Sequence, residues 1–307
     1  ILRVKAAVAR HFREVLSERG FVEIQSPKLN AGVSEGGSDV FRTEYFGQRA
    51  CLAQSPQLYK QMALSSDLPG VFEVGPVFRA EKSNTSRHLC EFTGLDFEMP
   101  LDWHFSEVIT LAHQTLVLIF SAIESDCAGL LTTIRNMYPS SPLLLPREAV
   151  VIHWCDAMEL LRKAGYKRDV SADLSTEEEA MLGKIMRIEF GTDLFFLDFF
   201  PSAVRPFYTM TCEDDPRFSN SFDVFLRGQE IGSGAQRCHE PEMLEERCVE
   251  LGVSLEPLRP YLDSFRHGVP PHGGVGLGLE RILQLYLGLD NIRKAAFFPR
   301  DPTRLSP

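Results

Sequence analysis

Two runs of apolar and β-favouring residues, Val71–Arg79 and Phe92–Glu98, lie on either side of a short polar segment. Runs of this kind are typical of strands, so the pattern predicts two antiparallel strands joined by a long loop. The stretch from Phe78 to Glu98 contains three Arg or Lys residues, four Asp or Glu residues and one His. We therefore expect opposed charges to lie together on the loop and on the strand ends that face it.

Helical patterns occupy much of the remaining chain. Gly20 and Gly252 are expected to end two of these helices, because glycine commonly terminates a helix. Ser175 and Glu178 form a capping-box pattern at the start of a third. The predicted helical regions are Leu2–Arg19, 104–125, a mostly helical insertion over approximately 127–190, and Pro241–Leu251.

Strand patterns gather toward both ends of the chain. Besides the first pair, they are the segments 21–29, expected to end near Pro27, then 192–200, 205–210 and a pair within 219–237. Strands at both ends with helices between them predict an α+β fold, in which an antiparallel β-sheet is flanked by helices. We expect residues 1–307 to form one domain that includes the insertion.

The charge balance narrows the kind of ligand. The chain has 307 residues, 44% hydrophobic and 24% charged, and a formal net charge of -10. This composition predicts a sizeable core and argues against a basic surface that wraps a long nucleic acid. A small phosphate-bearing ligand, bound by local cationic groups, fits the sequence better.

The seven cysteines and the apolar segments bear on the compartment. Without a Cys-x-x-Cys pair, the cysteines favour reduced thiols in a cytosolic setting over a zinc site or a disulfide framework. No run of 18 apolar residues is present, so we expect a soluble chain with no membrane partner. The chain starts without Met inside a helical pattern, which predicts a fragment of a longer protein.

A glycine-rich segment at 272–289 passes directly into a helical pattern. It matches neither the G-x-G-x-x-G dinucleotide fingerprint nor a phosphate loop with Gly-Lys-Ser/Thr. Glu280 and Arg281 lie in the first turn of the predicted helix. The segment therefore predicts either a close approach of backbone to an anionic ligand or close packing of the helix.

Two arginines and two carboxylates suggest a nucleotide site. Arg79 ends one predicted strand and Arg281 begins a helix, so both could bind phosphates of one nucleotide, with His88 as a further donor. Asp223 and Glu230 lie on either side of a predicted hairpin turn, where their oxygens could hold Mg²⁺. For each residue taken alone, a solvated surface charge is the alternative interpretation.

These segments also carry a resemblance that covers nearly the whole chain. "GFVEIQSPKL", "FRAEKSNTSRHLCEFTGLDFE" and "GVGLGLERI" resemble the three motifs of class II aminoacyl-tRNA synthetases. "QSPQLYKQM", "AVRPFYTM", "EIGSGAQR" and "FFPRDPTRLSP" are similar to segments of the aspartyl-tRNA synthetases of the eukaryotic cytosolic type. The resemblance implies a class II catalytic fold, a homodimer and a cytoplasmic ligase of aspartate and tRNA(Asp) that consumes ATP.

The resemblance implies roles for the charged loop. Arg79 would bind the α-phosphate of ATP, and Phe92 would stack on adenine. The residues that would contact ATP or the terminal adenosine of the tRNA acceptor end are Glu81, Arg87, His88 and Leu89. Positive side chains would thus read phosphate, and negative ones would read base, amine and metal.

The resemblance also places the far end of ATP. Arg281, with Gly278 and Glu280 beside it, would hold the γ-phosphate, and Asp223 and Glu230 would carry Mg²⁺. The residues to which it assigns catalysis are Arg79, Arg281 and Glu230. Catalysis would then depend on positioning and charge stabilisation without a protein nucleophile.

Selection of aspartate over the near-isosteric asparagine requires a site that detects charge. By resemblance, Lys60 and Arg237 would bind the side-chain carboxylate, while Asp96 holds the lysine. The residues implied to contribute the remaining contacts to aspartate are Ser55, Gln57, Ser233 and, near the substrate amine in the 34–37 loop, Glu35. Asparagine would leave two buried cations without a partner, which costs roughly 3–5 kcal/mol.

Two other functions are compatible with the motifs. One is an asparaginyl-tRNA synthetase, although Lys60 and the "LDFE" segment with Asp96 favour aspartate. The other is a non-catalytic synthetase-like binding module, although Arg79, Glu230 and Arg281 are all present. The resemblance further implies an N-terminal anticodon-binding domain that is absent from these 307 residues, so we expect adenylate formation but poor charging of tRNA.

Overall fold

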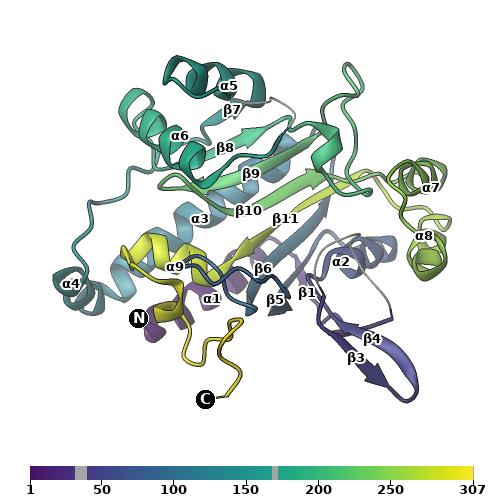
Figure 1. Cartoon of the computed structure of the whole chain (residues 1–307), viewed down its shortest axis with the longest axis horizontal. Helices are drawn as coiled ribbons and strands as arrows, with labels where there is room; N and C mark the ends of the chain where they lie inside the picture. Colours follow the sequence, from purple (N-terminus) through teal and green to yellow (C-terminus); the bar gives the residue numbers. More distant parts are fainter. Residues whose placement is uncertain (32–39, 168–171, 307) are drawn as a thin grey trace.

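A computed structural model describes residues 1–31, 40–167 and 172–306. Its centre is an eight-stranded sheet with flanking helices (Figure 1). In order across the sheet, the strands are β1 (Val22–Glu23), β5 (Val71–Phe78), β6 (Glu91–Pro100), β11 (His272–Gly278), β10 (Gln229–Gln236), β9 (Ser221–Leu226), β8 (Leu194–Asp198) and β7 (Val151–His153). The predicted α+β fold is confirmed.

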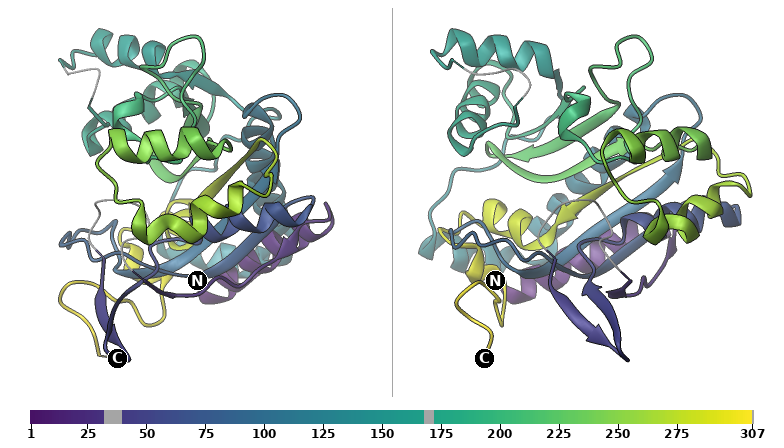
Figure 2. Two further views of the ribbon diagram at one scale, coloured as in Figure 1. Left: turned by 90° about the vertical axis from the view of Figure 1, so that its right-hand side faces the viewer. Right: turned by 45° about the vertical axis from the view of Figure 1, so that its right-hand side comes forward.

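Helices and a small second sheet complete the described chain. The second sheet contains β2 (Leu29–Asn30), β4 (Gln48–Leu52) and β3 (Arg42–Tyr45), and its β3–β4 hairpin projects from the body of the protein (Figure 2). The α-helices are α1 (Leu2–Ser17), α2 (Gln57–Ala63), α3 (Ser106–Asp126), α4 (Ala128–Met137), α5 (Trp154–Lys163), α6 (Thr176–Glu189), α7 (Pro241–Glu250), α8 (Arg259–Phe265) and α9 (Leu279–Leu287).

The predicted antiparallel pairing holds for the six central strands and fails at the two edges. β5 pairs with β6 in antiparallel register from Val71↔Glu98 to Phe78↔Glu91, as expected. β1 pairs with β5 and β7 pairs with β8 in parallel, so the sheet is mixed. Long connections separate each edge strand from its partner in the sequence. The periodicity of the sequence does not predict whether strands joined in this way pair in parallel or antiparallel.

Two predicted strands differ from the structure. The segment 205–210 is not a strand: it forms turns, with a single isolated bridge between Thr209 and Arg237. Pro206 lacks the N–H that a strand in the middle of a sheet must donate. The segment 21–29 contributes only the two-residue β1 and the first residue of β2, and residues 24–28, which include Pro27, are not in a strand.

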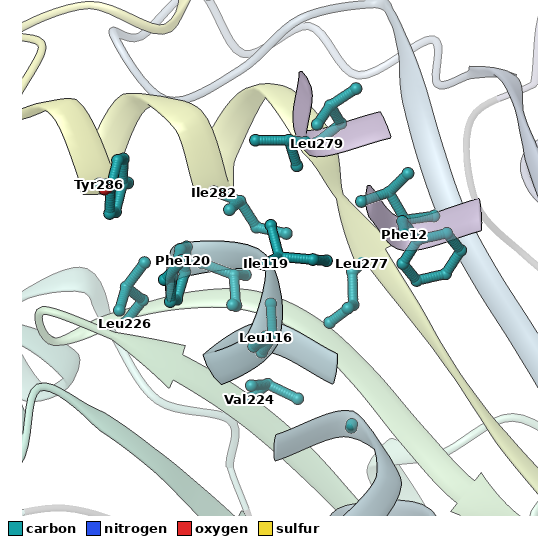
Figure 3. Close-up of a cluster of buried hydrophobic side chains, with 14 of the residues drawn as sticks. Phe12, Leu116, Ile119, Phe120, Val224, Leu226, Leu277, Leu279, Ile282 and Tyr286 are labelled. Carbon is teal, nitrogen blue, oxygen red and sulfur yellow. The ribbon is translucent and has the colours of Figure 1, made fainter. Parts of the chain in front are cut away.

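The main core lies where α1, α3 and α9 pack on one face of the sheet (Figure 3). Phe12 of α1, Leu116 of α3 and Ile282 of α9 point into it together with Val224 and Leu277 of the sheet. Because the apolar residues of α3 recur at helical spacing, a continuous stripe faces the strands. This packing fixes the start of α9, which carries Arg281, against the end of β11.

Among the described residues, α3 is long and apolar enough to cross a membrane by length and composition alone. Inside the protein, 56% of its apolar window is buried. Leu116, Ile119 and Phe120 of this helix lie in the core shown in Figure 3. Burial of this kind is typical of the central helix of a globular domain.

The helix α6 lies against the turn of the β9–β10 hairpin. A Cβ atom added to Gly183 of α6 would lie 2.2 Å from the Cα atom of Gly228 in that turn. Arg227 and Gly228 have φ values of 50° and 70°, as in the two-residue turns that favour glycine. The backbones of helix and turn therefore touch, and this contact requires glycine at position 183.

Gly183→Ala is expected to lower the free energy of unfolding by about 1–3 kcal/mol, because the new methyl group meets backbone atoms of Arg227 and Gly228. Gly129→Ala is the matched control, since its Cβ would have no neighbour within 4 Å. That change should leave stability equal or up to about 1 kcal/mol higher. Urea unfolding of both variants measures the difference, and equal midpoints would contradict the contact.

Candidate functional site

Alternation along β6 separates an apolar face of the sheet from a charged face. Leu95 and Phe97 are fully buried in the main core, whereas Asp96 and Glu98 point to the opposite face. A cavity opens on that opposite face. Its walls come from β6, β10, β11, the loop between β5 and β6, the first turn of α9 and the segment 205–209.

Most of the residues predicted for the site line this one cavity. The lining residues from the predicted nucleotide set are Arg79, Glu81, Arg87, His88, Leu89, Phe92, Glu230, Gly278, Glu280 and Arg281. Those from the predicted aspartate set are Ser55, Gln57, Asp96, Ser233 and Arg237. Lys60 and Asp223 are buried behind the lining, and Glu35 lies outside the described residues.

Arg281 connects two walls of the cavity. Its Nη1 donates to the carbonyl oxygen of Glu230 at 3.0 Å, and its Nη2 donates to the carbonyl oxygen of Arg87 at 3.2 Å. Burial lowers the pKa of Arg281, and the carboxylate of Glu230 opposes this effect. The guanidinium is thus held between the β9–β10 hairpin and the charged loop, where it remains cationic.

Arg79 is far less restrained. Its side chain is 50% exposed, and its nearest carboxylate, that of Glu81, is 3.9 Å away. The guanidinium lies 5.6 Å from the centre of the Phe92 ring, within range of a cation–π contact. Arg79 therefore presents an accessible positive charge beside an aromatic face.

His88 is held by the loop itself. Its Nδ1 lies 2.6 Å from Oγ1 of Thr85 and 3.2 Å from Oγ of Ser83. Burial lowers its pKa, and the positive charge of Arg281 lowers it further. The neutral ring is therefore favoured, so His88 can serve as a hydrogen-bond donor but contributes little positive charge at neutral pH.

Glu280 lines the cavity, but its carboxylate binds neighbouring elements. Oε1 accepts from Nζ of Lys5 at 2.6 Å and from Oγ1 of Thr93 at 3.1 Å, and Oε2 accepts from the backbone N–H of Thr93 at 2.9 Å. These bonds attach the first turn of α9 to α1 and β6. The geometry supports a role in placing Arg281 more than direct contact with an anion.

A buried charge network lies behind the cavity. Lys60 is 1% exposed, and its Nζ is 3.1 Å from Oδ1 of Asp96 and 3.3 Å from Oε2 of Glu98. Arg237 donates from Nε to Oε1 of Glu98 at 2.8 Å. Glu98 therefore joins both cations, whereas the sequence analysis named only Asp96, as the partner of Lys60.

The pKa values of the two carboxylates of this network are shifted in opposite directions. Burial raises the pKa of Asp96, only partly opposed by Lys60. Burial acts the same way on Glu98, but Arg237 and Lys60 outweigh it, so the pKa of Glu98 is lowered. The directions of these shifts mark Glu98 as the carboxylate whose ionised form both cations stabilise.

The glycines of β11 leave space for these carboxylates. A Cβ atom at Gly274 would lie 2.2 Å from Oε2 of Glu98, and one at Gly276 would lie 2.8 Å from Oδ1 of Asp96. The glycine-rich strand therefore admits the acidic side chains of its neighbour β6. Sequence analysis predicted ligand approach or helix packing; the space needed by these carboxylates is a further reason for glycine, and Gly276 also lines the cavity.

Asp223 is buried next to a cation that the sequence analysis did not identify. Nη2 of Arg205 donates to Oδ1 of Asp223 at 2.9 Å, and its guanidinium lies 3.8 Å from the centre of the Phe200 ring. Burial raises the pKa of Asp223 well above its usual value, and the negative charge of Glu230 contributes. Arg205 was missed because its segment resembled an ordinary strand.

The pair of Asp223 and Glu230 fits a metal that arrives with a nucleotide. In the part of the chain that the structure describes, no group of three or more His, Cys, Asp or Glu side chains could hold an ion by itself. Mg²⁺ is commonly bound by one or two carboxylates together with substrate phosphates. Two mutually repelling carboxylates on one hairpin match that arrangement.

Comparison with known proteins identifies the family. The family described as "tRNA synthetases class II (D, K and N)" matches residues 1–302. Aspartate--tRNA ligase 1, cytoplasmic, of Arabidopsis thaliana is 51% identical over all 307 residues, and the chain spans 58% of that relative's length.

Solved structures show the same fold. A putative aspartyl-tRNA synthetase from Leishmania major Friedlin superposes with a TM-score of 0.92 at 44% identity, covering 100% of this chain and 66% of the other. The asparaginyl-tRNA synthetase of Pyrococcus horikoshii complexed with asparaginyl-adenylate gives 0.91 at 32% identity, covering 99% and 69%. The predicted class II synthetase fold is confirmed, and the chain belongs to the class II tRNA synthetase family of the D, K and N enzymes.

Proposed function

We propose that this chain is the catalytic part of an aspartate–tRNA ligase. It would use ATP to activate L-aspartate as aspartyl-adenylate and then transfer the aspartyl group to the 3′-end of tRNA(Asp). The observation that carries the proposal is the buried network in which Lys60 and Arg237 share Glu98 at one end of the cavity. The 51% identity to an aspartate–tRNA ligase over the whole chain supports it.

Each part of the cavity would have a role in the adenylation step. An oxygen of the aspartate α-carboxylate attacks the α-phosphorus of ATP, and the bond from that phosphorus to the bridging oxygen breaks to release pyrophosphate. Arg79, exposed at the cavity, binds the α-phosphate as charge accumulates there. Arg281 binds the distal phosphates, and Phe92 provides the aromatic face for adenine.

Asp223 and Glu230 would hold Mg²⁺, which would neutralise phosphate charge when bound. Arg205 provides a positive partner for Asp223. We propose that Glu230 is the primary ligand, because it lines the cavity, whereas Asp223 lies behind the lining and is paired with Arg205. Asp223 would orient Arg205 and contribute a second oxygen.

Recognition of the amino acid depends on charge. The side-chain carboxylate of aspartate would bind Arg237, which lines the cavity, with Lys60 behind it. Ser55, Gln57 and Ser233 would complete the polar surroundings, and Glu35 would lie near the substrate amine. Asparagine fills the same space but brings no negative charge to Arg237 and Lys60, so the site would discriminate against it.

The remaining features of the proposal follow from the relatives. Several curated relatives are named cytoplasmic aspartate--tRNA ligases, which supports a cytoplasmic location, the acceptor end of tRNA(Asp) as partner, and no membrane. We also propose a homodimer, in which β1 and the segment after it meet a second copy. Anticodon recognition would belong to a separate domain, since the chain spans only part of its relatives.

ATP–pyrophosphate exchange with Mg²⁺ and either aspartate or asparagine tests the function, because this assay needs no tRNA. We expect exchange with aspartate, at least about 100-fold faster than with asparagine, from the charge that asparagine lacks. Faster exchange with asparagine would replace the proposal with an asparaginyl enzyme. Exchange with neither, in folded protein that binds ATP, would support a non-catalytic binding module.

A further inference from the structure

The charged loop between β5 and β6 is attached to the helical segment that lies between α3 and β8. Nη2 of Arg87 is 2.6 Å from Oε2 of Glu179, and Nη1 donates to Oγ1 of Thr176 at 2.9 Å. Both acceptors lie at the start of α6, about 90 residues further along the chain. The guanidinium thus has two fixed bonds to one helix.

This ion pair is largely removed from water. The side chains of Arg87 and Glu179 are 15% and 12% exposed. Burial raises the pKa of Glu179, and the hydrogen bond and positive charge of Arg87 oppose this rise, so Arg87 favours the ionised form of Glu179. Separating such a pair leaves a buried charge without compensation, which is strongly unfavourable. A nucleotide entering the cavity would therefore meet Arg87 still bound to Glu179.

The helix α6 is itself rigidly placed. Its first turn has a complete capping box, in which Oγ of Ser175 accepts from the N–H of Glu178 and the Glu178 side chain accepts from the N–H of Ser175. One turn further on, Gly183 touches Gly228 in the β9–β10 turn. The same hairpin carries Glu230, so one helix contacts both the hairpin and the loop.

Arg281 links the β9–β10 hairpin to the charged loop. It donates to the carbonyl oxygen of Glu230 from one nitrogen and to that of Arg87 from the other. Fixing the position of Arg87 therefore also fixes one of the two anchors of Arg281. Arg87 and Arg281 both line the cavity, whereas Glu179 and Thr176 do not.

We propose that Glu179, assisted by Thr176, is a positioning residue of the nucleotide site: from α6 it holds Arg87 at the cavity wall and, through the main chain of Arg87, steadies Arg281. The inference rests on the proposed function and deepens it. The helical segment between α3 and β8 then contributes to nucleotide binding without touching the nucleotide.

Glu179→Gln tests the proposal, because it keeps the size of the side chain and removes its charge. We expect it to weaken ATP binding about tenfold in calorimetry with Mg²⁺ and no amino acid, and to raise KM for ATP similarly in the exchange assay. KM for aspartate should stay unchanged. The control is Glu177→Gln, which alters an exposed carboxylate two residues away on the same helix and should change nothing.

A double-mutant cycle checks that Glu179 acts through Arg87. Arg87→Ala and the combination of Arg87→Ala with Glu179→Gln should bind ATP equally weakly, since the second change removes a partner already lost. If Glu179→Gln fails to fold, Thr176→Val removes the second bond alone and should weaken ATP binding about threefold.

Other outcomes would overturn the inference. Unchanged ATP affinity in Glu179→Gln would show that α6 does not position the loop, and tighter binding would show that Glu179 competes with ATP for Arg87. Additive effects in the cycle would also contradict it. Wild-type protein that binds ATP but exchanges with neither amino acid would overturn only the proposed function, while failure to bind ATP would overturn both.

Discussion

Arg79→Ala is expected to slow ATP–pyrophosphate exchange by about 10²–10³-fold while leaving the protein as stable as before. The activity loss follows from removing a charge aimed at the reacting phosphate, a class of change that costs about that factor. Stability should not change, because Arg79 is half exposed and its nearest carboxylate is 3.9 Å away. Exchange kinetics and thermal unfolding of the same preparation measure both effects.

Arg217→Ala is the matched control for Arg79→Ala. Arg217 is also exposed, also lies near an aromatic ring, with its guanidinium 5.9 Å from the centre of the Phe218 ring, and is absent from the cavity lining. Its removal should leave exchange unchanged. Equal losses in both variants would point to a general effect of removing surface charge, and an active Arg79→Ala variant would remove Arg79 from the reaction.

Lys60→Leu is expected to abolish the preference for aspartate and to lower the free energy of unfolding by about 3–5 kcal/mol. The lysine is 1% exposed, and without it Asp96 loses its ion-pair partner inside the protein. The site would also lose one of the two cations that separate an acid from an amide. Exchange with each amino acid and urea unfolding test the two parts separately.

Two further variants interpret the result for Lys60→Leu. Lys163→Leu removes an exposed lysine paired with Glu159 and should change neither stability nor specificity. Combining Lys60→Leu with Asp96→Asn removes both charges of the pair and should recover part of the stability while specificity stays lost. A Lys60→Leu variant that still prefers aspartate would assign selection to Arg237 alone.

The sequence predicted the centre of the fold better than its edges. The structure contains both predicted antiparallel pairs, β5 with β6 and β9 with β10. In these strands the local sequence pattern and the tertiary contacts favour the same conformation. β1 and β7 pair in parallel through long connections, which local periodicity does not specify. The segment 205–210 has a strand-like composition, but its backbone turns, and Thr209 alone bridges to Arg237.

The candidate site shows a similar division. Motif residues such as Arg79, Arg281 and Glu230 could be predicted, and they do line one cavity. Glu98 could not be assigned, because it meets Arg237 across 139 positions of sequence and only the register of β6, β11 and β10 brings them together. The contacts of Arg87 with Glu179 and Thr176 likewise depend on how α6 packs against the loop, which the sequence of neither segment predicts.

The glycines of β11 set a limit on redesigning this site. Gly274 and Gly276 leave the space that the carboxylates of Glu98 and Asp96 occupy. A side chain at either position would displace the carboxylate of Glu98 or Asp96, which holds Lys60 or Arg237 in place. Recognition of the substrate's charge would then be lost even if every residue that contacts the amino acid were unchanged. Libraries that aim at a new amino-acid substrate should therefore keep both glycines and vary the cavity-facing Gln57 and Ser233 instead.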